Sequence, residues 1–188
     1  MAGEIQPDDV PPLNPAELSI EILDATQRLT RGQVEWLASH AHKAAGRLGA
    51  AGSVRVRVVN DAEMSAAHAE FLEDPTTTDV LTFDMSEGLA DVLPPTPESV
   101  RLGSELIVFV LDTDILACVD VASRQAASRG YSVEKELLLY VVHGMLHCMG
   151  HDDLDDESSA AMHAVEDAVL EAIGVGRAFA APRTDGQG

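Results

Sequence analysis

The sequence is poor in cysteine, and it lacks any long apolar run. Its 188 residues include two cysteines, Cys118 and Cys148, which are too few for a disulfide framework and predict reduced, buried thiols. No segment approaches the roughly 18 consecutive apolar residues that mark a membrane-spanning helix. The first ten residues, MAGEIQPDDV, contain neither the basic nor the apolar part of a secretory signal. We therefore expect a cytoplasmic protein with no membrane partner.

Positive charge is also scarce, and this restricts the class of partner. Twelve Lys and Arg residues oppose 32 Asp and Glu residues, which gives a formal net charge of −20. Such a chain repels polyanions at long range, whereas nucleic-acid-binding proteins usually carry the opposite sign. No DNA partner is expected. An RNA-binding function would need a local basic patch, a bound cation or a partner protein.

The hydrophobic pattern predicts one α/β (α+β) domain over residues 17–174, with a mixed sheet of about four strands packed with helices. Hydrophobic residues make up 46% of the chain, enough for a sizeable core at this length. Alternating or continuously apolar segments predict strands at 18–26, 53–60, 78–85 and 104–112. Helical periodicity and end signals predict helices at 31–48, 61–72, 113–130, 132–150 and 160–174. Composition predicts a flexible arm (1–16), a loop (86–103) and a flexible tail (175–188).

The most informative segment reads HGMLHCMGHDD and begins at His143. His143 and His147 are four residues apart on an apolar helix, so they lie on one face and can share one metal ion. Gly150 predicts a left-handed turn that ends the helix and returns the chain. Either His151 or Asp153 could then reach the ion, and the return layout of metzincin-type motifs favours Asp153. Three protein ligands leave a fourth position for water, which predicts a catalytic site with one Zn²⁺.

The residue after the first histidine restricts the chemistry. Metalloproteases of the HExxH type carry a general-base Glu there, but this chain has Gly144, so a peptidase is disfavoured. Phosphodiester cleavage does not need that Glu, because a bound ion can deliver hydroxide and polarise a phosphoryl oxygen. The catalytic base is not identified by the sequence. Gly144 is also typical of a helix that packs closely on a neighbour, and Cys148 faces away from the histidines, as a core residue does.

These segments together resemble the YbeY family. HGMLHCMGHDD is similar to the family signature His-Gly-x-Leu-His-Leu-x-Gly-Tyr-Asp-His. TTTDVLTF (76–83) looks like its Pro-Thr-Asp-Val-Leu-Ser-Phe segment, and LGSELIV (102–108) is similar to its Gly-Asp/Glu-Ile-x-Ile strand. The resemblance runs in order from about residue 18 to 173. Asp153 stands where the family has its third histidine, His151 where it has tyrosine, and Leu72 where it usually has an arginine.

The resemblance implies a single-strand-specific, metal-dependent endoribonuclease that acts in 16S rRNA 3′-end maturation and ribosome biogenesis. It implies precursors of the small ribosomal subunit and ribosomal proteins as partners, and a zinc site formed by His143, His147 and Asp153. Two alternatives stay open. One is a non-catalytic, zinc-containing ribosome-assembly factor, and the other is a zinc hydrolase of another substrate class.

Overall fold

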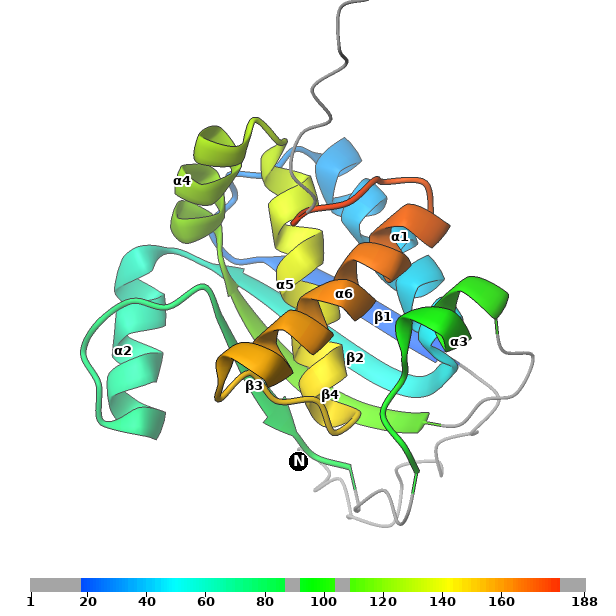
Figure 1. The fold of residues 1–188 in the computed structure, drawn as a ribbon. Coiled ribbons are helices and arrows are strands. Elements are labelled where there is room, and N and C mark those ends of the chain that lie inside the picture. Colours follow the sequence, from blue (N-terminus) through cyan, green and yellow to red (C-terminus); the bar gives the residue numbers. More distant parts are fainter. Residues whose placement is uncertain (1–17, 87–91, 104–108, 180–188) are drawn as a thin grey trace, which may run out of the picture.

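Four strands and six helices lie along residues 18–86, 92–103 and 109–179, the part of the chain that the computed structural model describes; strands and helices alternate up to the fourth strand, and three helices follow it (Figure 1). The strands are β1 (Leu18–Asp24), β2 (Ala50–Val59), β3 (Val80–Asp84) and β4 (Phe109–Cys118). The helices are α1 (Arg31–Leu48), α2 (Asp61–Leu72), α3 (Pro97–Leu102), α4 (Val119–Arg129), α5 (Val133–Cys148) and α6 (Asp156–Ala172). None of these helices is both long and apolar enough to cross a lipid bilayer.

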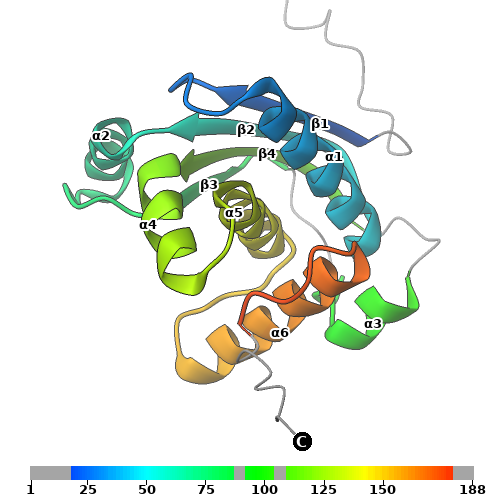
Figure 2. The ribbon, with the colours of Figure 1, turned by 90° about the horizontal axis from the view of Figure 1, so that it is seen from above.

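The strands form one mixed sheet in the order β1-β2-β4-β3. β1 pairs with β2 in parallel and β2 pairs with β4 in parallel, so that Val54 lies between Ile20 and Thr113. β3 pairs with β4 antiparallel. Figure 2 shows α1 and α5 against one face of this sheet, with α6 and α3 in an outer layer. The predicted fold class, a mixed four-stranded sheet packed with helices, is confirmed.

Helix α5 is enclosed between the sheet and α6, with α1 and α4 on its flanks (Figure 2). Every residue from Leu137 to Val142 is buried, and a helix whose middle section is largely apolar on all sides belongs in such a position. Gly144 allows the close approach to the sheet. A Cβ atom there would lie 2.7 Å from Thr82 Oγ1 and 3.0 Å from Ile115 Cδ1. The predicted structural role of Gly144 is therefore confirmed.

The helix predicted at 113–130 is wrong in its first six residues. Residues 113–118 belong to β4, and the helix begins only at Val119. The Thr113-Asp114 pair, which suggested a helix cap, instead continues an alternating strand. Thr113 and Ile115 are fully buried, while Asp114 lies on the opposite face and pairs with Arg55 at 2.5 Å. Pairing with β2 and β3 decides this conformation, and a local pattern does not contain that information.

Smaller differences occur at the predicted loops and ends. The segment 86–103 contains α3, which Thr96 caps and Pro97 begins; six residues are too few to show a helical period. Helix α6 starts four residues earlier than the predicted 160, because Asp155 caps it. Residues 104–108 of the strand predicted at 104–112 lie outside the described residues, as do the predicted arm (1–16) and most of the tail (175–188). The domain boundaries stay predictions, although residues 175–179 continue from α6 and their Ala178 and Phe179 amides donate to Asp167.

Candidate metal centre

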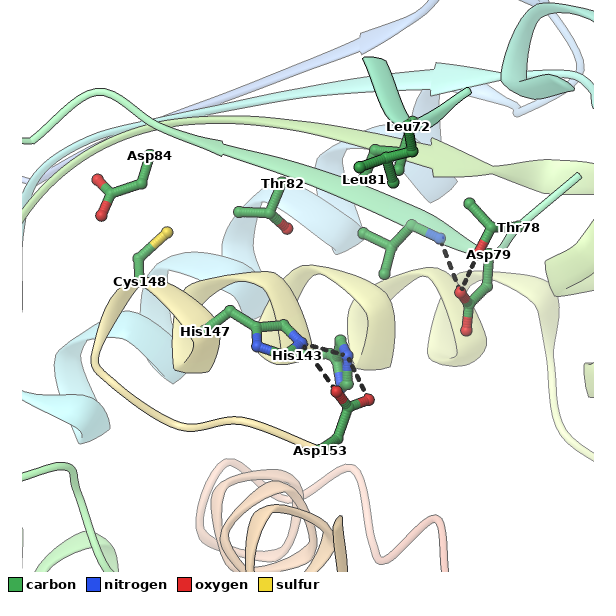
Figure 3. Close-up of a pocket in the computed structure, with 11 residues that line it drawn as sticks. Leu72, Thr78, Asp79, Leu81, Thr82, Asp84, His143, His147, Cys148 and Asp153 are labelled. Atoms are coloured by element: carbon green, nitrogen blue, oxygen red, sulfur yellow. Dashed lines mark hydrogen bonds and ion pairs between the residues drawn. The ribbon is translucent and has the colours of Figure 1, made fainter. Parts of the chain in front are cut away.

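The two histidines of the motif lie on one face of α5, near its C-terminal end (Figure 3). The helix ends at Cys148, and the Gly150 amide donates to the His147 carbonyl at 3.1 Å. Gly150 has a φ of +88°, which residues with a side chain rarely adopt. This turn reverses the chain, and in Figure 3 the Asp153 carboxylate on the returning segment points at both imidazole rings. The predicted glycine turn is confirmed.

The three side chains offer one ligand atom each, and these atoms lie within 4.8 Å of one another. The Nε2 atoms of His143 and His147 are 2.9 Å apart, and they lie 3.8 and 3.9 Å from the oxygens of Asp153. Ligands about 2.0–2.1 Å from a tetrahedral zinc ion are separated by about 3.3 Å. The two imidazoles are closer together than this value and the Asp153 oxygens are farther from them, so the three side chains have to shift for all three ligands to reach one ion.

Hydrogen bonds fix which nitrogen of each ring can bind a metal. His143 Nδ1 lies 2.8 Å from Glu166 Oε1, and His147 Nδ1 lies 3.1 Å from the carbonyl oxygen of His151. Both partners are acceptors, so both Nδ1 atoms donate. The two Nε2 lone pairs then face each other at 2.9 Å. This arrangement is repulsive unless a proton or a cation lies between them, which is the condition that a metal ion meets.

Glu166 supports the site from α6. Its side chain is 1% exposed, and its Oε1 accepts the hydrogen bond from His143. Burial opposes protonation of the ring, but the hydrogen bond and charge of Glu166, assisted by Asp153 and Asp79, outweigh it and raise the pKa of His143. A carboxylate behind a metal-binding histidine orients the ring and makes it a stronger ligand.

The alternative third ligand points elsewhere. His151 Nε2 lies 2.8 Å from the Pro95 carbonyl, and His151 is not part of the cluster. Cys148 is buried, its Sγ lies 3.3 Å from Thr113 Oγ1, and burial raises the pKa of its thiol. Both cysteines are free and buried, as predicted. Among the described residues, the structure thus brings His143, His147 and Asp153 together; their role as ligands stays a prediction.

A cleft of about 410 Å³ opens beside the cluster, between α5 and β3. Its described lining residues include Asp79, Asp84 and Asp153 but no Lys or Arg. Leu72, which stands where the resemblance predicts an arginine, lies on this lining and is 60% exposed. Without a bound cation, the cleft therefore repels a phosphodiester.

Two acidic residues of this region were not assigned a role from the sequence. Glu166 is adjacent to Asp167 in the last helix, and such an acidic pair does not by itself distinguish a buried carboxylate from a solvated one. Asp79 lines the cleft, and its Oδ1 accepts from the Val80 amide at 2.9 Å and from the Thr78 hydroxyl at 3.1 Å. No local pattern indicated that Asp79 would face the histidines across the cleft.

A His/His/Asp cluster that opens into a cleft, on the central helix of an α/β domain, defines a candidate metal-dependent hydrolase. The family model described as "Endoribonuclease YbeY" matches residues 18–174. The chain therefore belongs to the YbeY family.

Curated relatives carry the same description. The Endoribonuclease YbeY of Micrococcus luteus is 35% identical over 130 residues, which cover 69% of this chain and 75% of the relative. That of Heliobacterium modesticaldum is 36% identical over 120 residues, or 64% and 69% of the two chains. That of Shouchella clausii is 29% identical over 162 residues, or 85% and 98%. A Thermotoga maritima protein of known solution structure is 23% identical with a TM-score of 0.49, covering 81% of this chain and 90% of that one.

Proposed function

We propose that this protein is a zinc-dependent endoribonuclease that cleaves single-stranded RNA in the cytoplasm and matures the 3′ end of 16S rRNA in precursors of the small ribosomal subunit. Membership of the YbeY family supports the activity. The observation that carries the metal-dependent part is the pair of Nε2 atoms, 2.9 Å apart, on rings whose Nδ1 atoms already donate elsewhere. Nitrogen and carboxylate ligands in a set of three favour zinc with one open position.

His143, His147 and Asp153 would hold the ion, which supplies a water of pKa about 7 and a Lewis acid for the phosphoryl oxygen. The remaining residues act on the substrate and on the ligands. Glu166 keeps the His143 ring in one orientation. Because the described lining has no Lys or Arg, the phosphate has no positive side chain to bind, and only polar groups such as the Thr82 hydroxyl can donate to it.

The acidic cleft also bears on the substrate. Because no basic residue in the described part of its lining neutralises its carboxylates, affinity for a long polyanion has to come from the ion and from contacts to the bases. Single-stranded RNA satisfies this condition, because its unstacked bases are accessible, whereas a duplex presents mainly phosphates.

The test is zinc content and RNA cleavage measured on the same purified sample. We expect about one zinc per chain and chelator-sensitive cleavage of single-stranded RNA. His147→Ala should lose both properties, whereas His42→Ala, which removes an exposed histidine of α1, should keep both. Full zinc content in His147→Ala would refute the ligand set. A zinc-loaded wild type that cleaves no RNA would instead support the non-catalytic assembly factor.

A further inference from the structure

The polar face of α5 continues beyond the candidate metal ligands. Tyr140 and Glu136 precede His143 by three and seven residues, so all three lie on one side of the helix. Both side chains are deeply buried, at 4% and 1% exposed. They line a second cavity of about 200 Å³, which shares His143, Asp153 and Asp79 with the cleft described above. The two cavities are therefore adjacent, with the His/His/Asp cluster between them.

Three buried polar atoms of residues that line this second cavity have no hydrogen-bond partner among the described residues. They are Glu136 Oε2, Glu166 Oε2 and the Tyr140 hydroxyl. The other oxygen of each carboxylate is already held: Arg129 donates to Glu136 Oε1 and His143 donates to Glu166 Oε1, both at 2.8 Å. Folded proteins leave few buried polar groups unpaired, because each one costs free energy. The two fixed acceptors therefore point to a ligand that brings hydrogen-bond donors, and the hydroxyl points to one that also brings an acceptor.

The charge of the cavity is consistent with such a ligand. Burial raises the pKa of Glu136, and the positive charge of Arg129 opposes that shift. Burial also raises the pKa of Tyr140, which keeps its hydroxyl protonated. Glu136 and Tyr140 lie close enough for a mutual side-chain hydrogen bond to contribute to the pKa of each, but neither Glu136 Oε2 nor the Tyr140 hydroxyl has a partner at full hydrogen-bond geometry among the described residues. Both groups thus remain available to a bound molecule.

A second metal ion does not fit this cavity. The described residues contain one group of three or more potential metal ligands close enough to share an ion, and it is the His/His/Asp cluster. The volume is below the roughly 300–1,000 Å³ of pockets for drug-sized ligands, so it suits one ring system. Leu139 and the stacked rings of His163 and Phe179, with centroids 3.8 Å apart, form an apolar and aromatic part of the wall. Flat bases in single-stranded RNA bind to surfaces of this kind.

We propose that this second cavity binds a guanine base of the RNA, on the nucleotide next to the phosphate that is cleaved. This inference rests on the proposed ribonuclease function. Guanine presents three N–H hydrogens on its Watson–Crick edge, against two on the amino group of adenine or cytosine and one in uracil. Guanine is the one base of the four with two donor nitrogens side by side on this edge, so that N1–H and the 2-amino group can donate to Glu136 Oε2 and Glu166 Oε2 while O6 accepts from the Tyr140 hydroxyl.

Glu136→Gln provides a directional test because Arg129 fixes the orientation of the new amide. Arg129 donates to the Oε1 position of residue 136. The amide oxygen of the glutamine therefore has to occupy that position, and its NH₂ group faces the cavity. An acceptor of the pocket thus becomes a donor. The variant should lose its preference for guanine and gain affinity for bases with carbonyl edges, above all uracil. Tyr140→Phe removes only the hydroxyl and tests the same pocket if Glu136→Gln folds poorly.

The experiment measures binding of mononucleotides to the zinc-loaded full chain by isothermal titration calorimetry. GMP, IMP and UMP carry the same phosphate, so differences between them report on the base; GMP and IMP differ only in the 2-amino group. We expect GMP to bind about tenfold more tightly than IMP or UMP, the discrimination typical of one specific base contact. The matched control is Glu134→Gln, on the same helix but outside the cavity, where Glu134 Oε2 accepts from Gln33 at 3.1 Å. It should keep the wild-type ratio.

Cleavage of single-stranded RNA with guanosine or inosine at one position separates this inference from the proposed function. Equal cleavage of the guanosine and inosine RNAs, together with equal affinities for GMP and IMP, would overturn the guanine pocket and leave the ribonuclease intact. A GMP preference that Glu136→Gln abolishes, in a protein that cleaves no RNA, would support the pocket and overturn the ribonuclease. A GMP preference unchanged in both Glu136→Gln and Tyr140→Phe would place guanine elsewhere and overturn the inference.

Discussion

Gly144→Ala should destabilise the protein although alanine is the better helix former. In a free helix the exchange would contribute about 1 kcal/mol of stability. Here the new Cβ would lie 2.7 Å from Thr82 Oγ1 and 3.0 Å from Ile115 Cδ1. Overpacking of a well-packed core costs about 1–3 kcal/mol, because the neighbours have to move. We expect a net loss of up to about 2 kcal/mol in the free energy of unfolding, and a fall in Tm of up to about 8 °C for a chain of this size.

Gly46→Ala is the matched control, because Gly46 lies in α1 and a Cβ there meets no atom within 4 Å. This variant should be more stable than the wild type by about 0.5–1 kcal/mol. Urea unfolding followed by circular dichroism measures both values. The two changes in the free energy of unfolding should have opposite signs. If both variants are stabilised equally, α5 is not held against the sheet as closely as described.

Three further perturbations test the site and its surroundings. Glu166→Gln should weaken zinc affinity by about 10–100-fold, measured by chelator competition, because the histidine behind the ion loses its carboxylate partner. Leu72→Arg should lower the KM for RNA several-fold by adding a positive charge to the cleft, whereas Leu102→Arg, exposed on α3, should leave KM unchanged. The hydrogen bond from Arg124 lowers the pKa of Asp61 from 3.8 to about 2, so its stabilisation is present above pH 4 and is lost as the pH falls from about 4 to about 2. Because Asp61 is 41% exposed, the loss should be only about 0.5–1 kcal/mol. Urea unfolding measured across this pH range should show the loss in the wild type but not in Arg124→Ala.

The arrangement of the candidate ligands could be predicted because it is encoded locally. The spacing of His143 and His147 places both rings on one face of a helix, and the glycine turn needs only Gly150 to return Asp153. Each of these steps depends on residues within about ten positions of one another. A local pattern is sufficient for such a site.

The remaining parts depend on contacts between distant segments. Glu166 lies 23 residues from His143, and its role follows only from the packing of α6 on α5. Residues 113–118 form a strand because β2 and β3 pair with them on either side, against a local pattern that indicated a helix. The cavity below Tyr140 likewise combines residues of α4, α5 and α6, which no single segment of the sequence contains.

Because α5 is enclosed, the histidine side and the carboxylate side of the candidate site differ in mobility. Amide protons in a helix covered on all sides exchange with solvent mainly through global unfolding, so His143 and His147 belong to the slowest-exchanging part of the chain. Asp153 lies on an exposed connecting segment between α5 and α6, where opening requires far less free energy. For the proposed zinc site we therefore expect exchange of the ion to begin on the carboxylate side, while the two imidazoles stay in position.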